Sequence, residues 1–165
     1  MTNFKTIPSI EALYTQYYPM VLQMSLGFVK GDRPVAKDLA QQVFINVWSA
    51  LDQFKETASY KTWIYRITVN TCLQYLRKQK TKPTARFDEV AYKLQQVEQP
   101  QENQDHSELY TAIGQLNEVD RLLIMMVLEE QEYEDIAEVM GISAVNVRVK
   151  IHRIKKRLKK ILQDG

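Results

Sequence analysis

The chain lacks several features that common classes of protein require. Its single cysteine, Cys72, has no partner for an internal disulfide, and no apolar run is long enough to span a bilayer. The N-terminal stretch MTNFKTIPSI does not contain the apolar segment of a signal peptide. These absences lead us to expect a protein of the reducing cytoplasm.

Motifs for catalysis and metal binding are also missing. The sequence contains no glycine-rich phosphate loop, and no Ser or Cys lies in a nucleophile motif. The two histidines, His106 and His152, are far apart and have no cysteine or carboxylate at metal-ligand spacing. We therefore expect a protein that is not an enzyme and needs no metal, cofactor or small-molecule substrate.

Helical periodicity runs through most of the chain, while strand-like alternation is absent. Apolar spacing predicts helices over residues 10–29, 35–51 and about 59–80, and Pro34 suits the first turn of the second helix. The expected apolar stripe of that second helix is Leu39, Val43, Phe44, Val47 and Trp48. The predicted fold class is all-α.

A segment of different composition divides the chain. Residues 83–107 are poor in aliphatic side chains, rich in glutamine and acidic overall, which is typical of a linker. Helical pattern resumes at residue 108. The sequence thus predicts two small helical domains, 1–82 and 108–165, joined by a flexible linker.

Charge is unevenly distributed, although the formal net charge is only +2. Residues 129–138 hold six acidic residues and no basic one, whereas residues 148–160 hold eight basic residues and no acidic one. Opposed blocks of this kind suggest one face turned toward a polyanion and another turned away from it.

The basic block lies in a pattern typical of a helix-turn-helix. A short helix over 133–140 is followed by Gly141, which can end it, and by Ser143, a good N-cap for a second helix. The apolar stripe of the second helix is Val147, Ile151, Ile154, Leu158 and Ile161. In this motif the second helix enters the major groove of DNA.

Aromatic and basic residues alternate in the first domain, between residues 54 and 82. Exposed rings can stack on unpaired bases while cations follow the phosphates, so this composition fits single-stranded DNA. The alternative is that the rings belong to the core. Trp63 shares a helical register with Ile67, which favours the core, whereas for Tyr60 the two interpretations are evenly balanced.

Three stretches together resemble a known family. DLAQQVFINVW (38–48), TWIYRITVN (62–70) and the segment LNEVDRLLIMMVLEEQEYEDIAEVMGISAVNVRVKIHRIKKRL (116–158) are similar to group 4 sigma factors. These are the extracytoplasmic-function (ECF) members of the sigma-70 family. The resemblance implies partners rather than substrates: core RNA polymerase, through its beta-prime clamp and beta flap, promoter DNA as duplex and as non-template single strand, and an anti-sigma factor.

The resemblance also implies three sets of binding residues. For core polymerase they are Asp38, Leu39, Gln41, Gln42, Ile45, Asn46 and Trp48, among which the polar ones are favoured because Trp48 also fits the core stripe. For the minus-ten element and single strand they are Phe54, Lys55, Ser59, Tyr60, Lys61, Trp63, Arg66, Asn70, Gln74, Arg77 and Lys78. For the minus-thirty-five element they are Ser143, Asn146, Arg148, Lys150, His152, Arg153, Lys156 and Arg157.

The chain departs from the family pattern at a few positions. Gln74 replaces a frequent Asp, Glu130–Glu132 replace a frequent Gly-Leu-Ser, and Val145-Asn146 replace a frequent Gly-Thr. The promoter sequence is therefore not predicted. Two other classes remain: a helix-turn-helix regulator with an N-terminal sensor or dimerisation domain, and a helical scaffold that binds only protein. The scaffold leaves the basic block of 148–160 unexplained.

Overall fold

The computed structural model describes residues 7–55, 57–81 and 107–164, and their regular structure consists of helices only. This confirms the expected all-α fold. The first module holds α1 (Ile10–Phe28), α2 (Arg33–Ala50), the short 3₁₀ helix η1 (Leu51–Gln53) and α3 (Tyr60–Thr81). The second module holds α5 (Ser107–Gly114), α6 (Glu118–Leu128), α7 (Tyr133–Met140) and α8 (Ala144–Asp164). The predicted linker lies almost wholly outside the described residues.

Side-chain caps explain where the first helices begin. The Ser9 hydroxyl accepts a hydrogen bond from the Ala12 amide (3.1 Å) at the start of α1. The Asp32 carboxylate accepts one from the Val35 amide (3.3 Å) at the start of α2, where Pro34 occupies the first turn. Each cap satisfies an amide that has no partner within its own helix.

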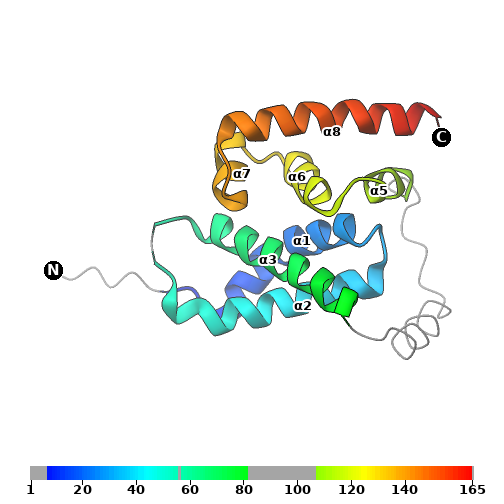
Figure 1. Ribbon diagram of the computed structural model, residues 1–165. Coiled ribbons are helices and arrows are strands. Elements are labelled where there is room, and N and C mark those ends of the chain that lie inside the picture. Colours follow the sequence, from blue (N-terminus) through cyan, green and yellow to red (C-terminus); the bar gives the residue numbers. More distant parts are fainter. Residues whose placement is uncertain (1–6, 56, 82–106, 165) are drawn as a thin grey trace.

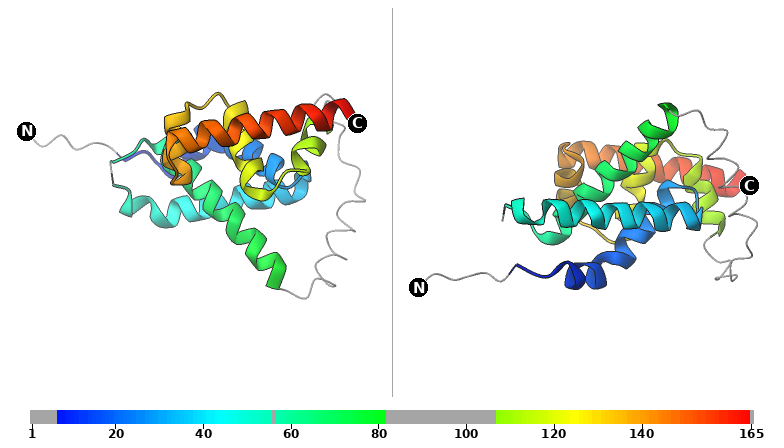
Figure 2. Two further views of the ribbon diagram at one scale, coloured as in Figure 1. Left: turned by 45° about the horizontal axis from the view of Figure 1, so that its top comes forward. Right: turned by 90° about the horizontal axis from the view of Figure 1, so that it is seen from below.

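The two modules pack directly against each other around one continuous apolar core. In Figure 1, α5, α6 and α7 lie over α1 and α3, while α8 and α2 form the outer layers on opposite sides. Figure 2 shows the C-terminal end of α3 projecting from this body. The modules are therefore closed on each other in this structure, an arrangement that the separate apolar stripes did not predict.

Polar contacts join the modules around the apolar part of their interface. The Arg121 guanidinium of α6 donates to the Phe28 carbonyl at the end of α1 (2.9 Å), and its Nε donates to the Leu116 carbonyl (2.9 Å). The Tyr110 hydroxyl of α5 donates to the Gln23 side chain of α1. Arg121 also lies 5.9 Å from the centre of the Phe28 ring. Side-chain hydrogen bonds from Arg121 and Tyr110 therefore stabilise the interface in addition to apolar packing.

One close contact between the modules involves Gly27, a residue without a side chain. Gly27 lies buried in α1, and a Cβ atom at this position would lie 2.2 Å from Sδ of Met125 in α6. Non-bonded contacts of Cβ atoms are essentially never shorter than 3.0 Å. The Met125 side chain therefore fills the space that Gly27 leaves open, and any larger residue at position 27 must displace it.

Candidate nucleic-acid and protein-docking surfaces

The helix-turn-helix predicted in the second module is present. α7 ends at Gly141, whose φ of 69° is in the left-handed region that favours glycine. The Ser143 hydroxyl accepts a hydrogen bond from the Asn146 amide (3.1 Å) and so caps α8. Four of the five residues of the predicted stripe, Val147, Ile151, Ile154 and Leu158, are buried, and Ile161 packs at its edge.

The other faces of α8 carry the basic block into solvent. All of the residues proposed to contact the minus-thirty-five element are exposed, namely Ser143, Asn146, Arg148, Lys150, His152, Arg153, Lys156 and Arg157. The Ser143 hydroxyl is used as a helix cap, and Arg157 also donates to the Gln115 carbonyl (3.5 Å). α8 lies along the outside of the molecule, so its basic face is accessible in the closed arrangement (Figure 1).

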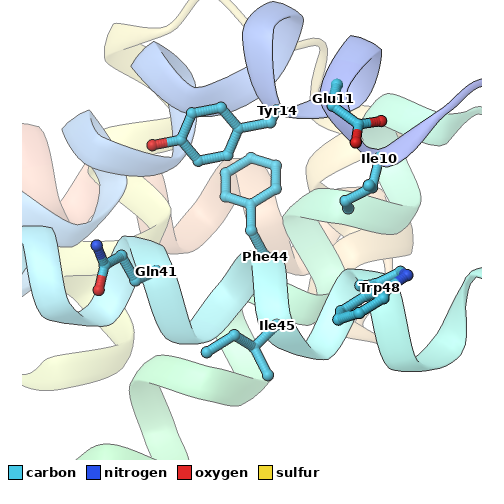
Figure 3. A pocket seen from close by; sticks show the side chains of 7 residues that line it. All are labelled: Ile10, Glu11, Tyr14, Gln41, Phe44, Ile45 and Trp48. Carbon is cyan, nitrogen blue, oxygen red and sulfur yellow. The ribbon is translucent and has the colours of Figure 1, made fainter.

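A shallow apolar pocket lies between the start of α1 and the middle of α2. Its walls are Ile10, Glu11, Tyr14, Gln41, Phe44, Ile45 and Trp48. Figure 3 shows the Tyr14 ring over Phe44, with Ile45 and Trp48 following along α2. The ring centroids of Tyr14 and Phe44 are 5.0 Å apart in an edge-on arrangement. Exposed apolar side chains on a helix face are typical of a protein-binding surface.

The exposure of Trp48 contradicts its place in the core stripe and is compatible with its other expected role, in docking. The sequence pattern assigned Trp48 to the core stripe, but its side chain is 67% exposed, and Ile45 is 53% exposed. The rings of Tyr14 and Tyr18 in α1 pack against Phe44, whereas Trp48 lines the open pocket. Leu39, which was expected among the contact residues, is instead buried in the core, where it is not available to a partner.

The polar residues proposed for docking divide into two groups. Asp38, Gln41 and Gln42 are exposed on α2. Asn46 is half-buried and connects two helices: its amide donates to the Thr71 hydroxyl of α3 (3.0 Å) and its oxygen accepts from Gln42 (3.1 Å). Asn46 therefore braces α2 against α3, in addition to any contact that it makes with a partner.

An aromatic cluster marks the beginning of α3. The Phe54 and Tyr60 rings are stacked, with centroids 4.2 Å apart, and Trp63 lies 4.9 Å from Phe54. All of these rings are half-buried, so Trp63 and Tyr60 pack on the core and also reach the surface. Ser59 caps α3 through the Thr62 amide (3.1 Å). Lys55 and Lys61 are exposed beside the cluster.

The remaining residues proposed for the minus-ten element follow α3. Asn70, Gln74, Arg77 and Lys78 are exposed between the middle of α3 and its C-terminal end. That end of the helix projects from the body (Figure 2). Arg66 is different, because it contacts the second module. Its Nη2 donates to the Glu138 carbonyl (3.1 Å) and lies 3.7 Å from the Glu138 carboxylate. In the closed arrangement Glu138 of α7 thus contacts Arg66, which is one of the cations proposed to bind DNA.

Burial changes the acidity of several groups. Burial raises the pKa of the Glu129 carboxyl at the end of α6, and the Lys61 ammonium opposes part of that rise. Burial, together with the charge of Glu129, raises the pKa of the Tyr65 hydroxyl. Burial raises the pKa of the Cys72 thiol to about 12, so Cys72 stays protonated and is a packing residue.

No group of His, Cys, Asp or Glu side chains in residues 7–55, 57–81 and 107–164 is arranged to hold a metal ion. In the same part of the chain, no helix is long and apolar enough to cross a membrane.

Each of the two modules matches the sequence model of a known protein family. Sigma-70 region 2 matches residues 13–82, and Sigma-70, region 4 matches residues 106–158. The ECF RNA polymerase sigma-E factor of Haemophilus influenzae is 30% identical over 169 residues, covering 94% of this chain and 88% of that protein. The RNA polymerase sigma-H factor of Pseudomonas aeruginosa is 29% identical, covering 94% of this chain and 86% of that protein. The chain belongs to the sigma-70 family, within its ECF group.

Solved structures share the fold across both modules. The sigma factor RpoE in complex with the anti-sigma factor NepR from Bartonella quintana superposes with a TM-score of 0.72 at 20% identity, covering 93% of this chain and 96% of that chain. CnrH in complex with the cytosolic domain of CnrY superposes with a TM-score of 0.67 at 19% identity, covering 94% and 88%.

Proposed function

We propose that this ECF sigma factor binds core RNA polymerase, reads duplex promoter DNA with α8, and holds unpaired non-template bases with the aromatic cluster of α3. The proposal rests on one observation: the chain has a separate surface for polymerase binding, for duplex DNA and for unpaired bases. α2 has an exposed apolar pocket, α8 has an exposed basic face, and half-buried rings lie beside Lys55 and Lys61. A regulator that only binds duplex DNA needs just the second of these.

The physical role of the aromatic cluster is to stabilise melted DNA. A base can stack on a ring only after it has left the duplex, so stacking favours the open state of the promoter. The free energy available is about 1–3 kcal/mol per base. The cations on either side neutralise phosphates regardless of sequence.

Reconstitution with core polymerase tests the proposal as a whole. The purified chain and core enzyme together should start transcription at a specific promoter, while core enzyme alone should not. A helix-turn-helix regulator would bind duplex DNA by itself and would give no initiation with core enzyme. That result would establish the alternative function.

A pre-melted template tests the aromatic cluster separately. Tyr60→Ala should keep core polymerase binding but lose more activity on duplex than on a template with an open bubble. Tyr60→Phe keeps the ring that stacks on Phe54, so it should behave like the unmodified chain. Equal losses on duplex and bubble templates would argue against a role in melting.

We also propose that an anti-sigma factor binds this chain and competes with core polymerase for the α2 pocket. RpoE and CnrH share its fold, and in their solved structures RpoE is bound to the anti-sigma factor NepR and CnrH to the cytosolic domain of CnrY. An interaction screen with the full chain and with Trp48→Ala as baits tests this. The expected partner binds the first bait more strongly and inhibits transcription in the reconstituted system. A partner that leaves core polymerase binding unaffected would contradict the competition.

A further inference from the structure

The outermost line of α8 is apolar at its beginning. Val145 is 66% exposed and Val149 is 43% exposed, although both lie on the helix that carries the basic block. At about 100° per residue, Val149 lies about 200° around the helix from the buried Val147, and Val145 about 160°. Both valines therefore point almost directly away from the core.

Polar residues stand on either side of this line. Asn146 and Arg148 are each about 100° from Val147 around the helix, in opposite directions. His152 and Arg153 continue the two flanks one turn later, and all four are exposed. These four side chains, all among those proposed for the minus-thirty-five element, thus flank the exposed face of α8, and the two valines lie along the middle of that face.

Local stability does not account for these valines. Valine is a poorer helix former than alanine, lysine or glutamine, and an exposed valine gains little from packing. In α8 such residues occupy the outermost positions of the first two turns. When a recognition helix enters the major groove, side chains near its beginning contact base edges, so these positions face the base pairs.

A valine can recognise only one chemical group in the major groove. It has no hydrogen-bond donor or acceptor, and the only apolar group that a base pair exposes there is the C5 methyl of thymine. We propose that Val145 and Val149 contact thymine methyl groups in the upstream promoter element and make α8 selective for thymine at those positions. This inference rests on the proposed function, because it requires that α8 reads duplex DNA.

Helix geometry limits where the two thymines lie. Residues four apart are about 6 Å apart along the helix axis. Successive base pairs are about 3.4 Å apart. The two contacts should therefore fall within about two base pairs of each other. Asn146 and Arg148 remain available to hydrogen-bond neighbouring bases or phosphates on the two sides.

The test removes the methyl group and nothing else. The complete holoenzyme, made from core polymerase and the full chain, first selects its upstream element from duplexes randomised at that element. Each selected thymine is then replaced by deoxyuridine. We expect about a fourfold loss of affinity at each of two neighbouring thymines, which is the effect of losing one buried methyl group.

Two alanine variants assign the contacts to residues. Val149→Ala should abolish the difference between thymine and deoxyuridine at one of the two positions, and Val145→Ala at the other. Neither change creates a cavity, and alanine favours the helix, so both variants should fold. Val119→Ala is the matched control: Val119 is 39% exposed on α6, and its replacement should leave both differences intact.

The outcomes separate this inference from the function on which it rests. A holoenzyme that selects no upstream element overturns the proposed function and the thymine contact together. A selected element without neighbouring thymines overturns the contact alone. So does an element whose thymines tolerate deoxyuridine, or variants that lose affinity equally with both bases, since that result would indicate a contact with protein instead.

Discussion

At the scale of single residues, two neighbouring aromatic side chains of α2 have different physical roles. Phe44 is buried beneath Tyr14, while Trp48, one turn later, is mostly exposed. Both line the same pocket. Tryptophan side chains at the centre of a protein interface often dominate the binding free energy. The pocket should therefore depend on Phe44 for its shape and on Trp48 for affinity.

Alanine substitutions should separate these two roles. Trp48→Ala is expected to weaken core polymerase binding at least about tenfold and to change the free energy of unfolding by no more than about 0.5 kcal/mol. Phe44→Ala should destabilise the fold by about 3 kcal/mol or more, since it leaves a cavity. Titration calorimetry with core enzyme and urea unfolding measure the two effects. A large loss of stability in Trp48→Ala would mean that Trp48 is a core residue after all.

The half-buried carboxyl of Glu129 should make stability depend on pH. Burial raises its pKa in the folded chain, so its protonated form fits the fold better than its charged form. Its contribution to stability is complete below the ordinary pKa of Glu and is lost as the pH rises through the raised value. Glu129 also ends α6, where the helix dipole disfavours a negative charge.

Glu129→Gln is therefore expected to raise the urea midpoint at about pH 7 and to leave it nearly unchanged at about pH 4. Glu134→Gln removes the same charge from an exposed position of α7 and serves as the control. A loss of stability at neutral pH in Glu129→Gln would show that the attraction of Lys61 outweighs the cost of burial.

At the scale of elements, left-handed residues follow three helices, α1, α6 and α7, and the turns after α6 and α7 use different residue types. α7 ends at Gly141, with a φ of 69°, while the turn after α6 places Glu130 at a φ of 59°. A side chain in this region costs about 1–2 kcal/mol, which glycine avoids. The Glu130 amide still donates to the Val127 carbonyl (2.9 Å), so the surrounding turn holds it in place.

Introducing a glycine at position 130 and removing the glycine at position 141 should change the free energy of unfolding in opposite directions. Glu130→Gly is expected to stabilise the chain by about 1 kcal/mol, and Gly141→Ala to destabilise it by about 1 kcal/mol. A Cβ at position 141 would meet no atom within 4 Å, so the second effect is purely conformational. Thermal unfolding of both variants provides the measurement. Two shifts of the same sign would contradict this account.

Most elements could be predicted from the sequence because their signals are local. The stripe of α8, the Ser143 cap and the Gly141 turn each depend on residues within a few positions of one another. The exposure of Trp48 could not be predicted in this way. It fits the stripe of α2, but the rings of α1 pack on Phe44 and Trp48 remains exposed, which depends on contacts between two helices.

At the scale of the whole molecule, the closed interface is the feature that the sequence did not reveal. Apolar periodicity predicts that one face of a helix is buried, but it does not predict which other helix covers that face. Gly27 and Tyr110, which join the modules, lie outside the stretches that carry the family resemblance, and the stretch that contains Arg121 does not indicate its contact with Phe28. Their pairing depends on packing between segments that are far apart in the chain.

A bulky residue at position 27 should open the molecule. Gly27→Leu places a side chain where Met125 now lies, so the modules are expected to separate and the radius of gyration from X-ray scattering to increase. Adding Met125→Ala creates space and should partly restore the closed dimensions. The helical content of both variants, measured by circular dichroism, should stay unchanged. Dimensions that remain closed in Gly27→Leu would mean that the interface tolerates the larger side chain.

The contact between Arg66 and Glu138 gives the closed arrangement an energetic consequence. Because the two modules belong to one chain, each module competes with external ligands for the surface of the other module. Its effective concentration in this competition does not change on dilution. A ligand that needs the open form binds with its intrinsic affinity multiplied by the open fraction. The stability of this interface therefore sets the apparent affinity of any ligand that binds only the open form.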